Sequence, residues 1–154
     1  MHSKDKTQLK VSALRNGTVI DHIPAQNLFK VISILKLEKI KTQITFGTNL
    51  ESKQLGSKAI IKISDVFFQQ EEISKIALVA PEAKLNIIKE YEVVEKKLLV
   101  APDEVKGIAR CFNPKCITNN EAITTRFEVL TKKPVSLKCH YCEKIMHAEH
   151  LVLI

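Results

Sequence analysis

The sequence predicts an α+β fold in two parts: an antiparallel sheet with two helices, followed by a small all-β domain. Residues 1–94 alternate between strand-like and helix-like hydrophobic periods. Residues 107–154 have no helical period and hold all four cysteines of the chain. With 154 residues, 45% of them hydrophobic, the chain is long enough for one ordinary domain or two small ones.

The first part is expected to begin with a pair of strands. Residues 7–14 alternate apolar and polar side chains, and the Asn16-Gly17 pair after them is a strong signal for a two-residue hairpin turn. Residues 18–23 would form the return strand. Residues 25–37 predict a helix, because apolar side chains recur there with a helical period at Leu28, Val31, Ile32 and Leu35.

The remaining elements of the first part repeat this order. Residues 43–50 and 57–64 predict two strands around a turn near Gly56. A second helix is expected over residues 70–79, with two glutamates in its first turn and a proline after its end. Residues 84–94 predict the final strand. Without the initial strand, the order is β-α-β-β-α-β, which is the ferredoxin-like plan with two helices on one face of the sheet.

The chain is therefore expected to divide into an N-terminal domain over residues 1–94, a charged linker over 95–106 and a C-terminal domain over 107–154. The C-terminal segment contains several short β-prone runs, at 123–130, 135–139 and 150–154. A segment of about 50 residues is too small to hold a good core unaided, so a metal or another cross-link is expected there.

The cysteines predict that cross-link. Cys111-x4-Cys116 and Cys139-x2-Cys142 are two short-spaced pairs separated by 22 residues, an arrangement that brings four thiolates to one tetrahedral ion. Four sulfurs leave no open coordination position, so the sequence predicts one structural zinc per chain in a zinc-ribbon or rubredoxin-like domain. Disulfides are the weaker alternative, because residues 1–10 lack the apolar core of a signal peptide and a reducing cytoplasm is expected.

Charge and composition restrict the other function classes. The net charge of +7 is spread along the chain and comes almost entirely from lysine, since arginine occurs only at three positions. A zinc-ribbon protein that binds nucleic acid is the alternative function, but it would need an arginine or aromatic platform near the cysteines, where only Phe112 and Tyr141 occur. No stretch is apolar enough for a membrane span. Neither nucleic acid nor a membrane is expected as a partner.

No catalytic motif is present, which disfavours an enzyme. Four glycines leave no Gly-rich phosphate loop, and HExxH and paired-carboxylate motifs are absent. Asp21 and His22 are adjacent in a predicted strand, so they are expected to point to opposite faces. Lys58 and Lys62 share one face, roughly 13 Å apart. This spacing suits a ribose or a phosphate chain, although a solvated strand face has the same pattern.

Several segments together resemble the regulatory chain of aspartate carbamoyltransferase. They are RNGTVIDHIPAQ (15–26), ITFGTNL (44–50), IKI (61–63), NIIKEYEVV (86–94) and the cysteine pattern of 111–144. The resemblance covers essentially the whole chain. It implies a non-catalytic subunit of pyrimidine biosynthesis that binds ATP as activator and CTP as inhibitor, with UTP assisting CTP in some members. It further implies homodimers through the N-terminal domain that link two catalytic trimers, with the zinc domain contacting the catalytic chain.

The resemblance also assigns an effector pocket. It implies that Asp21 and Lys62 hold the ribose and base, that His22 and Lys96 face the phosphates, and that Lys58 serves a second nucleotide. Backbone groups near residues 12–14 and 88–91 would recognise the base. The positions of the pocket are Val11, Ser12, Leu14, Val19, Asp21, His22, Lys58, Lys62, Asn86, Ile88, Tyr91, Val93 and Lys96.

Three residues depart from the family pattern. Ser12 stands where the best-known members have an acidic residue, and Glu95 beside Lys96 is expected to weaken triphosphate binding. Lys115 changes the first cysteine loop, where a polar amide can occur, and so bears on the contacts with the catalytic chain. The positions that match family residues at this interface are Asn113 and Glu143.

The pocket residues on the final predicted strand conflict in their parity. Asn86 and Ile88 would face one side, whereas Tyr91 and Val93 would face the other. If all four face one nucleotide, the strand must slip by one residue, and the sequence predicts a β-bulge at residues 89–90.

Overall fold

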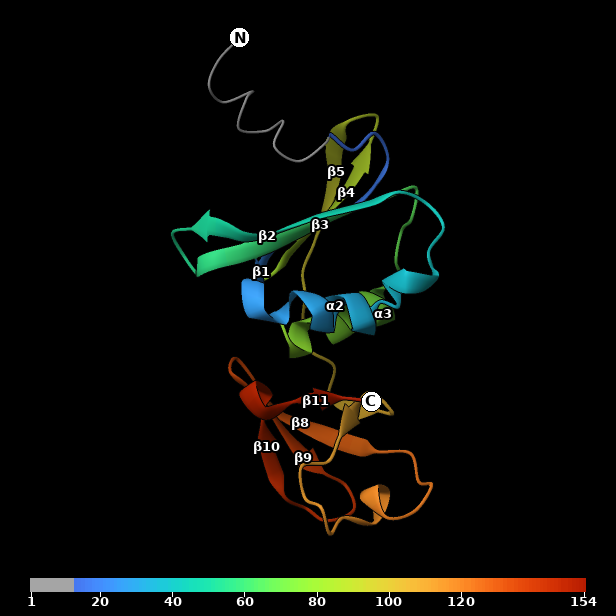
Figure 1. Cartoon of the computed structure of the whole chain (residues 1–154), viewed down its shortest axis with the longest axis vertical. Coiled ribbons are helices and arrows are strands. Elements are labelled where there is room, and N and C mark those ends of the chain that lie inside the picture. The colour runs from blue at the N-terminus through green and yellow to red at the C-terminus, as the bar shows by residue number, and fades with distance from the viewer. Residues whose placement is uncertain (1–12) are drawn as a thin grey trace.

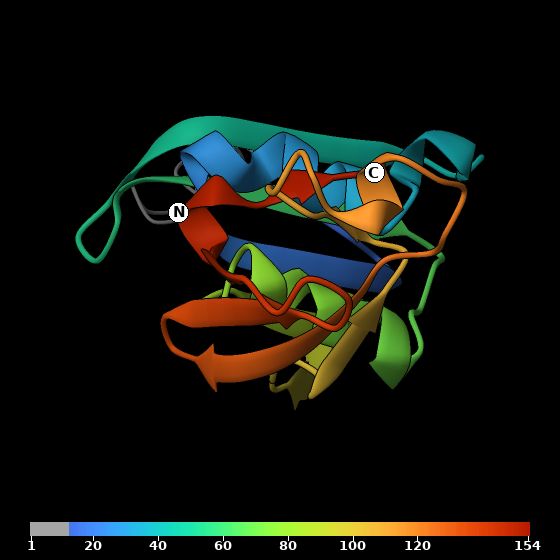
Figure 2. The same ribbon diagram turned by 90° about the horizontal axis from the view of Figure 1, so that it is seen from below.

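The computed structural model describes residues 13–154. A five-stranded sheet lies at one end, two helices lie against one of its faces, and a small β domain packs on the other side of the helices (Figure 1). Seen from below, this β domain lies over both helices (Figure 2). The strands of the large sheet are β1 (Gly17–Pro24), β2 (Ile44–Ser52), β3 (Gly56–Ser64), β4 (Lys84–Lys89) and β5 (Glu92–Lys97).

The strand order confirms the ferredoxin-like prediction. The sheet runs β2-β3-β1-β4-β5, and β1 pairs antiparallel with both β3 and β4. The first four strands therefore have the arrangement of a split βαβ unit, and β5 is added at the edge beside β4. The expected initial strand, 7–14, lies mostly outside the described residues. Its described members, Ala13 and Leu14, are not in a strand.

Both predicted helices are present, but each is shorter than expected and continues as 3-10 turns. The element from residue 25 is interrupted because Lys36 adopts a left-handed conformation with φ 53°. In the second helix, Gln69 and Glu72 form a capping box. No helix among residues 13–154 has the length and hydropathy needed to cross a membrane. The helical elements of the N-terminal domain are 3-10 turns at Ala25–Asn27, Leu37–Lys39 and Lys75–Leu78, and helices α2 (Leu28–Ile34) and α3 (Gln70–Ser74).

The prediction of a single final strand over 84–94 is wrong. The chain reverses at Glu90 and Tyr91, whose φ angles are 51° and 69°, so β4 and β5 form a hairpin with a two-residue turn. The predicted bulge at residues 89–90 is consequently wrong as well. Two-residue hairpin turns are usually recognised by Asn-Gly or Asp-Gly, because these residues tolerate positive φ. Glutamate and tyrosine do not favour positive φ, so the sequence gives no turn signal at residues 90–91.

Tertiary hydrogen bonds hold this unusual turn. The Tyr91 amide donates to the Arg15 carbonyl at 2.9 Å, and the Glu90 amide donates to the Asn16 side chain at 3.1 Å. The Arg15 guanidinium forms an ion pair with the Glu90 carboxylate at 3.2 Å. The residues just before β1 therefore cover the tip of the β4–β5 hairpin.

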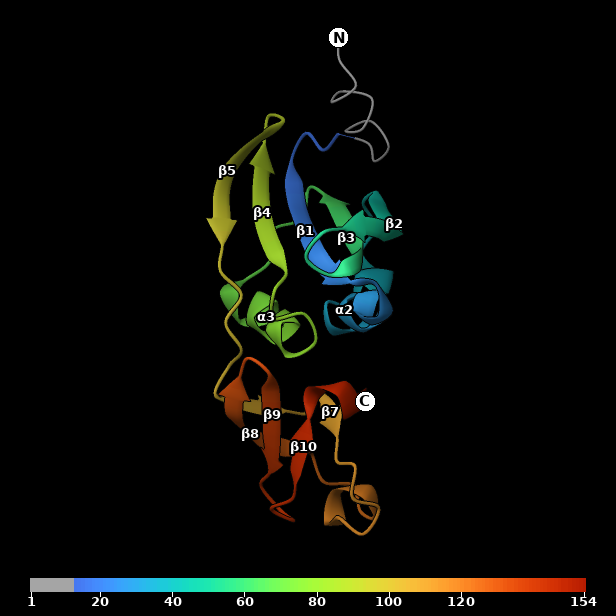
Figure 3. The ribbon, with the colours of Figure 1, turned by 90° about the vertical axis from the view of Figure 1, so that its left-hand side faces the viewer.

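The helices cover one face of the sheet and leave the opposite, outer face without helices (Figure 3). On β3, the apolar residues Ala59, Ile61 and Ile63 are completely buried. The alternate residues Lys58 and Lys62 are only half-buried, so the predicted division of this strand into two faces is confirmed.

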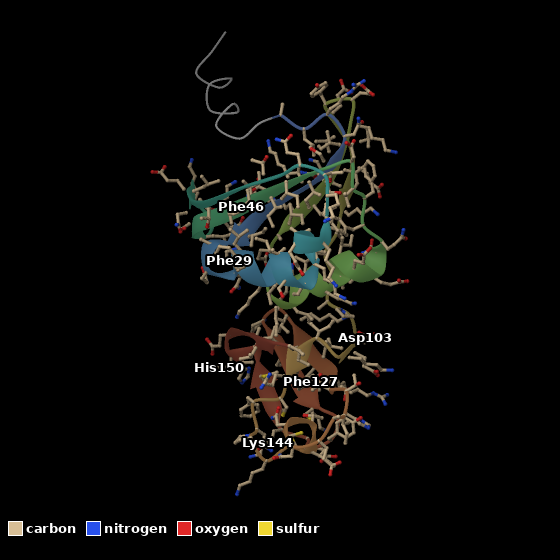
Figure 4. All side chains as sticks on the ribbon, turned by 45° about the vertical axis from the view of Figure 1, so that its right-hand side comes forward. Phe29, Phe46, Asp103, Phe127, Lys144 and His150 are labelled. Carbon is tan, nitrogen blue, oxygen red and sulfur yellow. The ribbon has the colours of Figure 1, made fainter. Side chains whose placement is uncertain are left out.

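The second domain is all-β, as predicted. Its four-stranded sheet has the order β10-β9-β8-β6, and β7 pairs with β11 separately. Phe127 is 1% exposed and lies at the centre of this domain (Figure 4). The strands are β6 (Glu104–Lys106), β7 (Ala109–Arg110), β8 (Arg126–Lys132), β9 (Val135–Cys139), β10 (Ile145–His147) and β11 (Val152–Leu153).

The two domains are in direct contact. The Lys30 ammonium of α2 donates to the Leu151 carbonyl at 3.2 Å, and Lys133 forms an ion pair with Glu82 at 3.6 Å. One cluster of buried apolar side chains runs through both domains. Within the segment expected as the linker, β5 ends at Lys97 and β6 begins at residue 104, so 98–103 is the stretch without regular secondary structure.

Replacing Gly17 with alanine is expected to lower the free energy of unfolding by about 2–4 kcal/mol, from overpacking and backbone strain. Gly17 has φ +143°, and an added Cβ would overlap the Ile63 carbonyl oxygen of β3. Gly56→Ala is the matched control, because Gly56 has φ +79° but no atom within 4 Å of the added Cβ. Urea unfolding measures both variants, and equal losses would contradict the overlap.

Candidate functional site

The four cysteines converge at one place in the second domain. Cys111 follows β7, Cys116 precedes a short 3-10 turn, Cys139 ends β9, and Cys142 lies in the turn before β10. Their four sulfur atoms all lie within 4.8 Å of one another. No histidine or carboxylate joins this group among the residues that the structure describes.

The sulfur geometry fits a tetrahedral metal ion. The Sγ atoms of Cys111 and Cys142 are 3.6 Å apart, and those of Cys116 and Cys139 are 3.7 Å apart. Zinc–sulfur bonds of about 2.3 Å at tetrahedral angles require sulfur–sulfur distances of about 3.8 Å. The cluster therefore has the geometry to hold one metal ion with four thiolates.

Hydrogen bonds fix the two cysteine loops around this site. The Asn119 side-chain Nδ2 donates to the backbone carbonyl oxygens of Cys111 and Asn113, both at 2.8 Å. In the second loop, the Glu143 amide donates to the Cys139 carbonyl at 2.9 Å, and Glu143 has a positive φ of 64°. These bonds fix the backbone of both loops next to the thiols.

The four thiols are not equally acidic. Burial raises the pKa values of Cys111 and Cys139. Burial also acts on Cys142, but the Lys144 backbone, the Asn113 side chain and the neighbouring thiols outweigh it and lower the pKa of Cys142 to about 7. Because a metal binds thiolates, it must displace protons from the buried pair, and binding is expected to weaken at acidic pH.

A second group of predicted residues lies on the outer face of the N-terminal sheet. The strand register places four of them directly opposite one another across β3, β1, β4 and β5. Directly opposed residues share a face, so these side chains form a continuous line across the sheet. We call this line the outer row: Lys62, Val19, Asn86 and Lys96.

Asp21 connects the outer row to the neighbouring positively charged groups. The Lys58 ammonium contacts the Asp21 carboxylate at 2.9 Å. Partial burial lowers the pKa of Lys62, and the charge of Asp21 opposes this shift. Asp21, Lys58 and Lys62 therefore place a carboxylate and two lysines on the half-buried part of the face, next to the outer row.

The expectation that Asp21 and His22 point to opposite faces is wrong. The β1–β3 register shifts between Ile20 and Ile23, so β1 has a bulge at these two residues, and His22 has φ 60°. The His22 Nδ1 lies 3.6 Å from the Asp21 carboxylate, which is too long for a hydrogen bond. The buried Nδ1 has no hydrogen-bond partner among the described residues.

A bulge in β5 explains how Val93 and Lys96 face the same way. Ile88 pairs with Val93, but Ile87 pairs with Glu95, so Val94 is an extra residue in β5. The hairpin and this bulge together explain how residues of opposite parity in the sequence can share one face. The bulge lies in β5, after the turn, and not at residues 89–90 as predicted.

The other predicted pocket residues lie outside the outer row. Tyr91 lies in the β4–β5 turn and is 65% exposed, and Leu14 is half-buried just before β1. Val11 and Ser12 lie outside the described residues. The pairing of Arg15 with Glu90, which sequence reasoning missed, links positions 75 residues apart, and no local pattern in the sequence reports it.

The two residues expected at the interface lie in the cysteine loops. Asn113 is half-buried and accepts a hydrogen bond from the Lys115 amide at 3.0 Å, whereas Glu143 is exposed. Lys144, next to Glu143, lies in the part of the domain that faces away from the helices (Figure 4). The cysteine loops are therefore accessible from outside the molecule.

Two family models match the chain. Residues 9–100 match the one described as "Aspartate carbamoyltransferase regulatory chain, allosteric domain". Residues 103–152 match the one described as "Aspartate carbamoyltransferase regulatory chain, metal binding domain". The second match agrees with the cluster of four cysteines.

Curated relatives carry the same name. The chain is 57% identical over 152 residues to the aspartate carbamoyltransferase regulatory chain of Bacteroides fragilis, with 99% of each chain covered. It is 55% identical to that of Phocaeicola vulgatus, with 99% of this chain and 98% of the relative covered. It is 50% identical over 147 residues to that of Pyrococcus abyssi, with 94% and 97% covered.

These relatives are named as regulatory chains and not as catalytic chains, which confirms the prediction that this chain is not an enzyme. The matches cover both domains of the fold described above. The chain belongs to the family of aspartate carbamoyltransferase regulatory chains, with an allosteric domain and a metal-binding domain.

Proposed function

We propose that the chain binds the nucleotide effectors ATP and CTP on the outer face of its N-terminal sheet and links catalytic trimers of aspartate carbamoyltransferase through a zinc domain. The outer row is the observation that carries the nucleotide part of this proposal. It puts two lysines at the ends of one line and an amide between them, on the face that the helices leave open. UTP is a further candidate ligand of this face.

Arg15, which directly follows the first segment expected to recognise the base, lies beside Tyr91 at the end of the second segment. The hydrogen bond from Tyr91 to Arg15 holds the residues before β1 against the turn that follows β4. Exposed backbone carbonyl and amide groups from two directions can distinguish the exocyclic amino groups of adenine and cytosine. The base would then lie near the hairpin tip, with the ribose close to Asp21 and Lys62.

The phosphates would extend toward the opposite end of the strands. His22 lies near this end of β1. The neighbouring Asp21 lies opposite Lys84 of β4 in the strand register. A phosphate oxygen would give the orphaned His22 Nδ1 a partner, and Lys96 would add a charge-assisted hydrogen bond.

The metal is proposed to be zinc, one ion per chain, held by Cys111, Cys116, Cys139 and Cys142. A closed shell of four thiolates suits a structural zinc, which would cross-link two loops of a domain too small for a large core. The four free thiols suit a reducing cytoplasm, where we place the protein.

A second copy of the chain is proposed to pack against the N-terminal domain at the β2 edge. β2 is an edge strand of the sheet. Beside it, Phe29 of α2 and Phe46 of β2 are 69% and 48% exposed, with ring centroids 6.4 Å apart (Figure 4). An open strand edge next to exposed aromatic rings suits a homodimer.

Removal of the metal is expected to release the regulatory chain from the catalytic trimers, because Asn113 and Glu143 lie in the cysteine loops. Size-exclusion chromatography of a mixture with the catalytic chain, with and without a chelator, measures the assembly. Substitution of Asn113 and Glu143 by alanine should have the same effect with the zinc retained. An intact holoenzyme after complete zinc removal would contradict this interface, and Lys53→Ala, in the β2–β3 turn, is the control that should still assemble.

A further inference from the structure

A groove lies where the β5 edge of the sheet approaches the second domain. It has a volume of about 390 Å³, within the range of ligand sites in proteins. Its walls come from the chain before and within β4, from the end of β5, and from Lys133 in the β8–β9 turn. We call it the edge groove. Figure 3 shows that the chain descends from β5 past the β8–β9 turn as it enters the second domain.

The edge groove has a strong positive charge. Four lysines and one glutamate line it: Lys84, Lys96, Lys97, Lys133 and Glu82. Glu82 contacts Lys133 at 3.6 Å. Lys84, Lys96 and Lys97 have no ion pair or side-chain hydrogen bond among residues 13–154. Three positive charges are thus left without a protein counter-ion in one small volume.

The other lining groups increase the effect of these charges. Leu85 and Leu99 are 1% and 7% exposed and form an apolar wall. A low-dielectric wall concentrates the field of nearby charges. Asn86 adds a neutral polar group. Lysine ammonium groups are compact point charges with three donors each, which suits the tetrahedral oxygens of phosphate groups.

We propose that the edge groove binds a phosphate chain, either the terminal phosphates of a bound nucleotide or a free polyphosphate. Asn86 and Lys96 belong both to the outer row and to the groove, so the line across the sheet leads into it. The nucleotide form of this inference rests on the proposed function, whereas the free-polyphosphate form does not.

A phosphate chain in the edge groove would connect the two domains. Lys133 lies in the second domain, whereas Lys84, Lys96 and Lys97 lie in the first. An anion held by all four lysines would compete with Glu82 for Lys133 and replace a weak ion pair between the domains. An anion bound in the edge groove would therefore change the contacts between the two domains.

The double variant Lys97→Ala/Lys133→Ala tests the site without touching the residues assigned to the nucleotide pocket. Calorimetric titration of the full chain with tripolyphosphate at low ionic strength should show roughly tenfold weaker binding, because two charge-assisted contacts at partly exposed positions are lost. Lys53→Ala removes an exposed lysine outside the groove and should leave binding unchanged. Wild-type binding of both tripolyphosphate and ATP by the double variant overturns the proposal.

Glu82→Gln should have the opposite effect. It removes the negative charge of the groove and frees Lys133, so tripolyphosphate affinity should rise roughly twofold to fivefold. A purely structural role of Glu82 as a link between the domains would instead lower or preserve the affinity. An unchanged or reduced affinity therefore counts against the groove as an anion site.

Competition distinguishes the two sources of the phosphate chain. If the groove takes the terminal phosphates of a nucleotide, tripolyphosphate should compete with ATP, and the double variant should weaken ATP binding but not AMP binding. If it takes a free polyphosphate, both ligands should bind together. Lys62→Ala separates this result from the proposed function, because its effect on AMP tests the nucleotide pocket alone.

Discussion

The Cys139→Ala variant is expected to lose its metal and to unfold residues 107–154, while the N-terminal sheet stays folded. Cys139 is completely buried, and its sulfur lies 3.7 Å from that of Cys116 at the centre of the cluster. Structural zinc in small domains contributes roughly 10–16 kcal/mol of apparent binding free energy, which is also folding free energy. A domain of this size has no core that could replace it.

Metal analysis and hydrogen exchange measure this result separately in the two domains. Zinc should be absent from the variant, and amide protection should be lost in β8 and β9 but retained in β1 and β3. His140→Ala is the matched control, because His140 is next to Cys139 but contacts the Tyr141 ring instead of the cluster, with centroids 5.0 Å apart. Full zinc retention by Cys139→Ala would contradict the assignment of the ligands.

Lys62→Ala and Lys96→Ala are each expected to weaken binding of ATP and CTP by about 1.5–3 kcal/mol, which is roughly 10-fold to 150-fold in affinity. Each variant removes a charged donor from one end of the outer row. Because burial lowers the pKa of Lys62, its charge should be lost as the pH rises, and at a lower pH than for an ordinary lysine. Nucleotide affinity should decrease in the same alkaline range.

Calorimetric titration with ATP and CTP is the measurement, with zinc content and dimer size as checks on folding. Lys41→Ala, an exposed lysine before β2, is the control that should bind normally. Wild-type affinity in both Lys62→Ala and Lys96→Ala would remove the pocket from this face of the sheet.

The predictable parts of the fold depend on local patterns. The strict alternation around Ile61 predicted which residues of β3 are buried, and the cysteine spacing predicted a four-sulfur cluster. The helices were predicted in type and place from their apolar period. The early end of the first helix was not predicted, because lysine at position 36 gives no signal for the left-handed conformation with φ 53° that it adopts.

The unpredictable parts depend on contacts between distant residues. The turn at Glu90 and Tyr91 is held by Arg15 and Asn16, so a single apolar run was interpreted as one strand. The bulge at Asp21 and His22 likewise shows only in the β1–β3 register. Both features place residues that were expected in the pocket on the outer face, and alternation along a strand alone would have misplaced them.

The apolar cluster that spans the domain junction can couple the two proposed binding activities, and any such coupling is thermodynamically reciprocal. If an effector on the sheet favours one arrangement of the two domains, a protein that fixes the second domain in this arrangement must raise the affinity for the effector by the same factor. Effector affinity measured on the free chain and on the assembled complex should then differ by this coupling factor. The ratio of the two constants would report the allosteric free energy without any measurement of enzymatic rate.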